Sequence, residues 1–328
     1  MDTATEQPRS TRKQRQGWRR ATRGIRRSVQ SWLATAAVWA LYPIPFRWMR
    51  FAGGWIARVV GRVVLGRTIR ANLDLVFGDT ITDAKKRRIR SQVCRNIGYI
   101  VAEVYQLWRG GVPSGYVSWH PSFDRVTAAL DEQRGFVAVT AHVGNWEYLG
   151  GAYRERFPSR SPNLVARRVP NQSLNAILER ARSRCGARTL YQTDSPRIAL
   201  RILKEGGMVG VAADQDVARI GGMFLPFFGH EAWTPTGPAF LAYRADVPLV
   251  PTFVVRTPKG LEVRCADPIE PRPNAPRTAE LERLTHAWTE AVEDCIRQHP
   301  GDWMWFHERW KTTRAKHAER LRRRRATA

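Results

Sequence analysis

A histidine and a glutamate lie close together in the segment TAHVGNWE at residues 140–147. A neutral imidazole at His142 can take a proton from a hydroxyl, and the carboxylate of Glu147 can fix the tautomer and stabilise the imidazolium. Five residues are about 140° out of phase on a helix, so the two groups meet only if His142 lies in a loop and Glu147 in the first helical turn. The spacing alone favours a structural pair. The alternative is acid–base chemistry on a hydroxyl nucleophile, without a serine or cysteine nucleophile.

The residues between this pair favour such a turn. Gly144 tolerates backbone conformations that other residues avoid, and Asn145 is a common residue at a helix N-cap. Backbone N–H groups near Gly144 or at the helix N-terminus would then be available to hold an oxyanion. We therefore expect Gly144 and Asn145 to act as oxyanion or positioning residues.

Short apolar runs that alternate with helical patterns must position this segment. The strands are predicted at residues 135–141, 208–213, 248–256 and 261–266, and the helices at residues 82–108, 171–185, 195–205, 235–245 and 278–297. Ser195 is expected to cap the third of these helices, with Pro196 in its first turn. This alternation predicts an α/β fold with a mostly parallel central sheet flanked by helices. Loops at the carboxyl ends of parallel strands are where such folds place ligand sites, which suits His142.

The helix predicted at residues 82–108 has one apolar face, interpreted as core. The apolar residues recur at intervals of three and four positions: Val93, Ile97, Ile100, Val101, Val104, Leu107 and Trp108.

The N-terminal region indicates contact with a membrane. Residues 32–46 are almost wholly apolar but contain Pro43 and Pro45, and the run is shorter than the roughly 20 residues that a spanning helix needs. A signal peptide has a similar form, but here the basic region is unusually long and no clear cleavage site follows. The next stretch mixes tryptophan and aliphatic residues with arginine, which is typical of an interfacial helix. We expect residues 31–66 to be a membrane-associated segment on the cytoplasmic leaflet.

The chain of 328 residues carries 54 basic and 29 acidic side chains, a net charge of +25. Residues 1–30 hold nine basic and two acidic side chains, and residues 309–328 hold nine and one, so the excess lies mainly at the ends. The first of these segments is predicted to be a disordered tail. Such charge attracts anionic membranes or nucleic acid, but no nucleic-acid-binding motif accompanies it, so specific binding to nucleic acid is the weaker alternative.

Cofactor and metal motifs are missing from the sequence. The four cysteines are scattered without metal-ligand spacing, and neither nucleotide-binding glycine motif occurs. We expect no metal and no cofactor.

Several blocks of sequence together resemble the late acyltransferases of lipid A biosynthesis, the lauroyl/myristoyl transferase family, and their mycobacterial relatives that acylate phosphatidylinositol mannosides. The segment around His142 resembles their HX4D/E motif. The other blocks, in chain order, are NL at 72–73, LVARRVPN at 164–171, ADQD at 213–216, FLPFFG at 224–229, TPTG at 234–237 and WMWFHERWK at 303–311. The resemblance extends from about residue 50 to residue 311. It implies a glycerolipid-acyltransferase-like fold and an enzyme that moves a fatty acyl chain from a thioester to a hydroxyl.

The resemblance assigns roles to individual residues. His142 and Glu147 fill the catalytic pair, and Asp214 matches an acidic position in the active site of the family. The phenylalanine and tryptophan blocks are expected to form the pocket wall, and His307 to belong to a structural tail.

Two arginines are implied as substrate-binding residues. Arg182 matches an arginine of the family if one gap is allowed, with Arg180 and Arg184 as alternatives, and Arg167 is the candidate for an arginine that precedes Asn171. Guanidinium groups suit the phosphate-containing parts of the substrates.

The acceptor and the donor stay open at this point. The residues between His142 and Glu147 are closer to the mannoside-acylating relatives, although those relatives often have aspartate where this chain has Glu147. The sequence thus lies between the two groups and does not identify the acceptor. We expect a lipid A-type precursor or related glycolipid, with phosphatidylinositol mannoside or a lysophospholipid as alternatives. The expected donor is an acyl carrier protein thioester or acyl-CoA. We expect an acyltransferase domain at residues 67–311 and a basic C-terminal tail at 312–328. The expected location is the cytoplasmic face of the inner membrane, with the N-terminal segment as the anchor.

Overall fold

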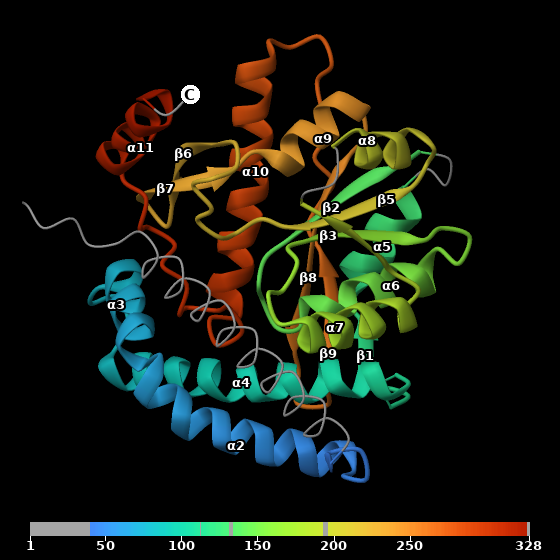
Figure 1. Cartoon of the computed structure of the whole chain (residues 1–328), viewed down its shortest axis with the longest axis vertical. Helices are drawn as coiled ribbons and strands as arrows, with labels where there is room; N and C mark the ends of the chain where they lie inside the picture. The colour runs from blue at the N-terminus through green and yellow to red at the C-terminus, as the bar shows by residue number, and fades with distance from the viewer. Residues whose placement is uncertain (1–39, 112, 131–133, 193–195, 327–328) are drawn as a thin grey trace, which may run out of the picture.

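The computed structural model describes residues 40–326 with the exception of residues 112, 131–133 and 193–195. The chain has an α/β fold in which a mostly parallel sheet lies between layers of helices, as the sequence predicts (Figure 1). The predicted disordered tail at residues 1–30, most of the apolar run 32–46 and the predicted cap at position 195 lie outside the described residues. Within residues 40–326 as described, no helix is both long and apolar enough to cross a membrane.

The central sheet has seven strands in the order β1–β9–β8–β2–β5–β3–β4. Neighbouring strands are parallel except for β8 and β9, which are antiparallel. The carboxyl ends of β2, β5 and β3 therefore meet at one edge of the sheet. In sheet order, the strands are Val117–Trp119, Leu261–Cys265, Leu249–Arg256, Phe136–Thr140, Met208–Ala212, Pro162–Ala166 and Arg188–Tyr191.

Strand β2 is buried on both faces, because successive side chains of a strand point to opposite sides. Val137 and Val139 enter the core beneath α8, α9 and α10, whereas Phe136 and Ala138 enter the core beneath α5, α6 and α7. A continuous apolar run is what such a strand requires. The six helices are Pro121–Ala129, Leu149–Arg156, Gln172–Arg184, Pro196–Lys204, Gly237–Ala245 and Arg277–Gln298, in the order α5 to α10.

Helix α4 (Asp83–Arg109) contributes to both cores. It begins after Thr82, whose hydroxyl accepts a hydrogen bond from the backbone N–H of Lys85 at 3.2 Å. The assignment of Val101 to the buried face is wrong, since its side chain is 65% exposed. Spacing of three and four residues does not distinguish the edge of an apolar stripe from its centre. The fully buried side chain nearby is instead a charged one, Glu103.

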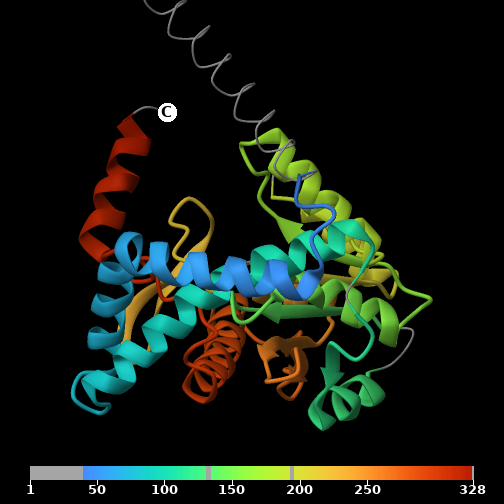
Figure 2. The ribbon, with the colours of Figure 1, turned by 90° about the horizontal axis from the view of Figure 1, so that it is seen from below.

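Helix α2 (Phe46–Val64) lies side by side with α4 (Figures 1 and 2). The two backbones approach closely, because a Cβ atom at Gly98 would lie 2.0 Å from the carbonyl oxygen of Gly53. The next helix, α3 (Gly66–Phe77), follows after a single residue. With glycine on its packed side, α2 presents its large side chains outward, and these are Trp48, Phe51, Trp55, Ile56, Val59, Val60, Val63 and Val64.

Strands β6 (Gly222–Phe227) and β7 (His230–Pro235) form a separate antiparallel hairpin. Its two turn residues, Phe228 and Gly229, have φ angles of 50° and 75°, the signature of a type I′ turn. The FLPFFG block is therefore a hairpin turn, and the N–H of Phe228 donates to the carboxylate of Glu293 on α10 at 2.8 Å.

The basic residues after position 312 form helix α11 (Arg314–Ala326). The imidazole of His317 stacks on the indole of Trp233 in β7, with ring centroids 4.2 Å apart. The predicted tail is thus helical over residues 314–326, and this contact docks it on the β6–β7 hairpin.

Candidate active site

His142 and Asp214 lie next to each other, just beyond the carboxyl ends of two adjacent strands. Strands β2 and β5 are adjacent and parallel, and their register pairs Thr140 with Ala212. His142 comes two positions after Thr140, and Asp214 comes two positions after Ala212. The register therefore brings together two residues that are 72 positions apart in the chain. The imidazole Nδ1 of His142 lies 2.6 Å from Oδ1 of Asp214, and the backbone N–H of His142 donates to Oδ2 at 3.0 Å.

The carboxylate of Asp214 fixes the tautomer of His142. Its side chain is 1% exposed, and the indole N–H of Trp303 donates to Oδ2 at 2.7 Å. An ionised carboxylate only accepts hydrogen bonds, so the proton of the neutral imidazole is on Nδ1. The other ring nitrogen, Nε2, is then an acceptor, as a general base requires.

The charges around the two side chains shift both pKa values. Burial lowers the pKa of His142, but the negative charge and hydrogen bond of Asp214, together with the charge of Glu147, outweigh it, so the pKa lies above its usual value. Burial raises the pKa of Asp214, yet the adjacent imidazole and the hydrogen bonds from His142 and Trp303 hold it well below its ordinary range. Asp214 therefore stays ionised and stabilises the imidazolium.

Glu147 does not orient His142 in the way predicted from the sequence. It lies in the short helix η1 (Trp146–Tyr148), and Arg182 binds both of its carboxylate oxygens at 2.8 Å through Nε and Nη2. This fork-to-fork ion pair holds Glu147 against α7, while Asp214 takes the place at Nδ1 of His142. The predicted hydrogen-bonding partner was wrong, because sheet register outweighs nearness in sequence. Glu147 still acts on His142 through its charge.

The three candidate arginines on α7 differ in position. Arg182 makes the ion pair with Glu147, whereas Arg180 lies over the ring of Trp108 and Arg184 is exposed. Because two donors of Arg182 are bound to Glu147, a direct contact between Arg182 and substrate stays a prediction.

Gly144 and Asn145 position the segment rather than offer free backbone donors. The N–H of Gly144 donates to the carbonyl of Asp302 at 2.9 Å, and that of Asn145 donates to the carbonyl of Val254 at 3.2 Å. These two N–H groups are therefore used in positioning the segment, which is one of the two roles predicted for Gly144 and Asn145. Gly144 has a φ angle of 56°, and a Cβ atom there would lie 1.7 Å from the Val254 oxygen. The close approach of the segment to β8 requires glycine at this position.

Asn145 is the N-cap residue of η1, but its side chain makes no capping hydrogen bond, because its amide is bound to another group. Its Nδ2 donates to the fully buried carboxylate of Glu103 at 2.8 Å. Arg256 binds the same carboxylate at 2.6 and 3.0 Å, and Tyr116 donates its hydroxyl to it. Sequence reasoning missed Glu103. The only signal was a carboxylate inside an apolar helical stripe, which must have partners if it is buried.

The C-terminal tryptophan block at residues 303–311 contributes side chains to the surroundings of His142 and Asp214. Besides Trp303, it contributes His307, whose Nε2 lies 2.8 Å from the amide nitrogen of Gln215. The same amide nitrogen lies 3.1 Å from Nε2 of His142. Asn72 on α3 holds this block in place by donating to the carbonyls of residues 305 and 307 at 2.7 and 2.8 Å. His307 therefore belongs to the surroundings of His142, not only to a structural tail.

The acidic run at residues 214–216 is divided between two tasks. Asp214 faces His142, whereas Asp216 accepts from the backbone N–H and the hydroxyl of Thr312 at 2.8 and 2.7 Å. Arg309 is also buried and donates at 2.7 Å to the Trp233 carbonyl and to the Thr234 hydroxyl. Asp216 and Arg309 thus attach the C-terminal segment to the sheet and the hairpin.

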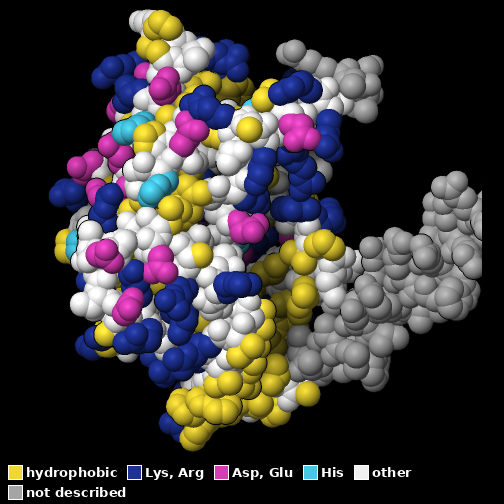
Figure 3. Space-filling view, turned by 90° about the vertical axis from the view of Figure 1, so that its left-hand side faces the viewer, with side chains coloured by type: hydrophobic (Ala, Val, Ile, Leu, Met, Phe, Trp, Pro, Cys, Tyr) yellow, Lys and Arg dark blue, Asp and Glu magenta, His cyan; other side chains and the backbone are white. Residues whose placement is uncertain are grey.

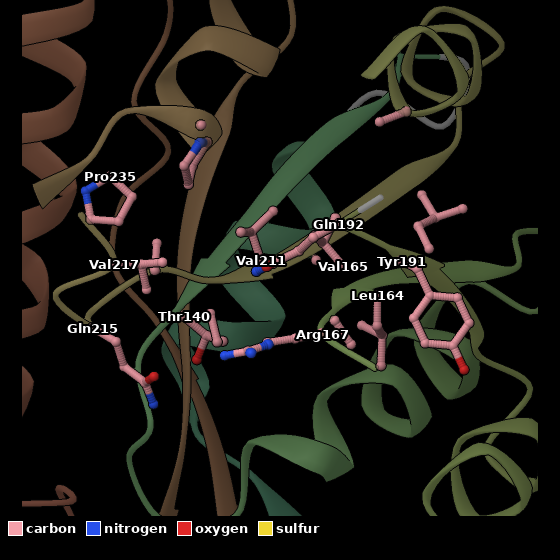
Figure 4. A pocket seen from close by; sticks show the side chains of 18 of the residues that line it. Thr140, Leu164, Val165, Arg167, Tyr191, Gln192, Val211, Gln215, Val217 and Pro235 are labelled. Atoms are coloured by element: carbon pink, nitrogen blue, oxygen red, sulfur yellow. The ribbon is translucent and has the colours of Figure 1, made fainter. Parts of the chain in front are cut away.

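A cavity of about 580 Å³ opens in front of His142. Figure 4 shows Thr140, Arg167 and Gln215 among its lining residues, at the carboxyl-end edge of the sheet. Arg167 follows β3 and is exposed. Away from this polar edge, the cavity is lined by aliphatic and aromatic residues: Leu164, Val165, Val169, Leu178, Leu190, Tyr191, Ile198, Val211, Val217, Ile220, Phe240 and Leu241. Such a cavity suits a ligand with a long apolar part and a polar reacting group.

Comparison with known proteins gives consistent matches. The profile of the family described as bacterial lipid A biosynthesis acyltransferase matches residues 19–312. The lipid A biosynthesis lauroyltransferase of Escherichia coli is 25% identical over 297 residues, which cover 86% of this chain and 91% of the relative. The palmitoleoyltransferase of the same organism is 25% identical over 290 residues, with the same coverage of each chain. The phosphatidylinositol mannoside acyltransferase of Mycolicibacterium smegmatis is 25% identical over 191 residues, 57% of this chain and 60% of the relative.

Proposed function

The chain belongs to the bacterial lipid A biosynthesis acyltransferase family, and from this premise we propose that it transfers a fatty acyl chain from a carrier thioester to a hydroxyl of a lipid A-type glycolipid. Its relatives are acyltransferases, and this chain is an acyltransferase as well. The observation that carries the proposal is the hydrogen-bonded pair of His142 and Asp214 at the polar edge of an apolar cavity.

This geometry supports a direct transfer in which His142 acts as a general base. Nε2 of His142 takes the proton of the acceptor hydroxyl as its oxygen attacks the thioester carbonyl carbon, and the carbonyl electrons move to oxygen. Asp214 stabilises the imidazolium that forms. The tetrahedral intermediate then collapses and the C–S bond breaks. The leaving thiolate accepts the proton from Nε2. The products are an ester and a free carrier thiol, and no covalent acyl-enzyme forms.

The cavity suits the two ends of an acyl thioester. Its aliphatic and aromatic lining accommodates a fatty acyl chain, and the exposed guanidinium of Arg167 at its rim can bind a phosphate group of the donor or the acceptor. Both acyl carrier protein, which is acidic, and acyl-CoA complement the basic chain. A phosphatidylinositol mannoside is the second candidate acceptor, favoured by the mycobacterial relatives.

A purified-enzyme assay tests this function. We expect the wild-type chain to acylate a lipid A precursor from acyl carrier protein or CoA thioesters, and His142→Ala to lose about 10²–10⁴-fold in turnover. Mass spectrometry of the acceptor detects the added acyl chain, and phosphatidylinositol mannoside and lysophospholipid serve as competing acceptors. Wild-type turnover in the folded His142→Ala variant would contradict the mechanism, and acylation of none of these acceptors would contradict the function.

We place the enzyme on the cytoplasmic face of the inner membrane through helix α2. Figure 3 shows hydrophobic side chains gathered over this end of the molecule, where α2 exposes Trp48, Phe51 and Trp55. Exposed arginines interrupt this face at positions 47, 58 and 62, so the helix matches an anionic lipid surface in which it lies flat.

Vesicle flotation tests this placement. Replacing Phe51 and Trp55 together by serine removes two side chains whose burial is each worth about 1.5–3 kcal/mol, so binding to anionic vesicles should weaken by more than about tenfold. Replacing Val101, an exposed apolar residue of α4, by serine is the matched control. Equal flotation of the double variant and the wild type would rule out α2 as the contact.

A further inference from the structure

The proposed reaction needs a donor for the oxyanion of the tetrahedral intermediate, and the backbone N–H groups from His142 to Asn145 are occupied. The N–H groups of Val143, Gly144 and Asn145 donate to the carbonyls of residues 141, 302 and 254, respectively. The N–H of His142 itself is bound to Asp214. The four successive N–H groups from the base to the start of η1 are thus used in holding the segment.

A side-chain donor lies beside the base instead. The amide nitrogen of Gln215 is 3.1 Å from Nε2 of His142, and its side chain lines the cavity (Figure 4). Nε2 is the atom that receives the proton, so the reacting hydroxyl must lie within hydrogen-bonding distance of it. A carbonyl carbon bonded to that hydroxyl oxygen brings its own oxygen within reach of the Gln215 amide.

The imidazoles of His142 and His307 determine that the amide nitrogen of Gln215, and not its oxygen, lies beside Nε2 of His142. Asp214 holds the proton of His142 on Nδ1, so Nε2 is bare and its neighbour must be a donor. His307 presents a second acceptor at 2.8 Å on the other side of the same nitrogen. Burial and the nearby His142 lower the pKa of His307 to about 4, so His307 is neutral and able to accept. One amide hydrogen is thus bound by His307, and the other points at the reaction centre.

We propose that Gln215 is the oxyanion donor of the acyl transfer and that His307 is the positioning residue that holds its amide. This inference rests on the proposed function. In the resting enzyme, Gln215 donates to Nε2 of His142; when the acceptor hydroxyl takes that place, the freed amide hydrogen donates to the oxygen that gains negative charge. The hydrogen bond to His307 stays intact throughout, so the donor needs no reorganisation at the moment of reaction.

Replacing Gln215 tests the proposal. Gln215→Leu removes the donor at similar size, and kcat should fall by about 10²–10³-fold with KM changed by less than about threefold, because the oxyanion exists only after attack. Gln215→Glu keeps the shape but places a negative charge where the oxyanion forms, so its kcat should fall at least as far. Should Gln215→Leu fail to fold, Gln215→Glu supplies the same comparison.

A neighbouring substitution controls for general damage to this loop. Thr312→Val removes the buried hydroxyl that donates to Asp216, one residue beyond Gln215, without touching His142. It should lower thermal stability and leave kcat within about twofold of the wild type. An equal loss of kcat in this control would overturn the assignment of a chemical role to Gln215.

The role of His307 is tested by rescue. His307→Phe removes the acceptor and should lower kcat by about tenfold, whereas His307→Gln, whose amide oxygen can accept, should restore most of that loss. Equal kcat in these two variants would show that His307 only fills space.

The outcomes separate this proposal from the proposed function. If the wild type transfers acyl chains and His142→Ala does not, the function stands. Gln215→Leu with wild-type kcat, or with an effect on KM alone, then overturns the oxyanion role by itself. If the wild type transfers no acyl chain to any acceptor offered, the function fails first.

Discussion

The segment at residues 142–147 has two sides that use their polar groups differently. On the cavity side, His142 keeps an accepting Nε2, and its near neighbours are a carboxylate and an amide. On the rear side, the backbone N–H groups of Gly144 and Asn145 and the amide of Asn145 are all bound to β8, to residue 302 and to Glu103. The rear side fixes the shape of the segment, and this leaves the cavity side able to do chemistry.

Two of the buried carboxylates, Asp214 and Glu103, make the same distinction. Asp214 pairs with a histidine, which can gain and lose a proton near neutral pH, whereas Glu103 pairs with Arg256, which stays charged. Burial of an ion pair is therefore not in itself a sign of catalysis. What distinguishes the pair proposed to be catalytic is a titratable partner that reaches the cavity.

The largest effect on activity is expected from Asp214→Asn. An asparagine cannot stabilise the imidazolium and can select the wrong tautomer of His142, so kcat should fall on the order of 10³–10⁴-fold. Steady-state kinetics measures the loss, and thermal unfolding checks that the variant is folded. A loss below tenfold would place Asp214 with Glu103 as a structural carboxylate.

The largest effect on stability is expected from Glu103→Ala. It leaves the buried guanidinium of Arg256 and the amide of Asn145 without their partner, which should cost about 3–5 kcal/mol in the free energy of unfolding. Denaturant-induced unfolding measures this quantity. Activity per folded molecule should fall less than in Asp214→Asn, and the reverse ranking would abolish the distinction between the two carboxylates.

A smaller loss of stability is expected from Gly144→Ala. The added methyl group would lie 1.7 Å from the Val254 oxygen at a positive φ, so the variant should lose about 1–3 kcal/mol of unfolding free energy or more. Gly221→Ala is the matched control, because a Cβ atom there has no neighbour within 4 Å. Equal stability of the two variants would show that the rear side of the segment is not tightly packed.

The smallest effect is expected in the pH profile. His142 must be neutral to act as a base, so kcat/KM should rise about tenfold per pH unit below its raised pKa and then level off. Glu147→Gln removes a charge that raises this pKa, so the rising limb should move to lower pH. Measuring kcat/KM of the wild type and of Glu147→Gln against pH tests this. If the rising limb lies at the same pH in both, the charge of Glu147 does not act on His142.

Much of the local structure was predictable from the sequence. Apolar runs and helical spacing predicted the strands β2, β5, β8 and β9 and the helices α4, α7, α8, α9 and α10 to within two residues of the observed ends. The short or partly polar strands β1, β3, β4, β6 and β7 were not predicted. Such strands carry weak patterns because neighbouring elements, more than their own side chains, stabilise them.

The sequence by itself determined that His142 follows a buried strand and that a turn and a short helix follow it, because these depend on nearby residues and a few backbone conformations. Family resemblance added Asp214 to the active site without giving its contact. Only the tertiary structure decided that Asp214, and not Glu147, binds Nδ1 of His142, and that Glu103 is a fully buried anchor. Those contacts depend on the register of β2 against β5 and on how α4 docks, and both are set by packing between segments far apart in the chain.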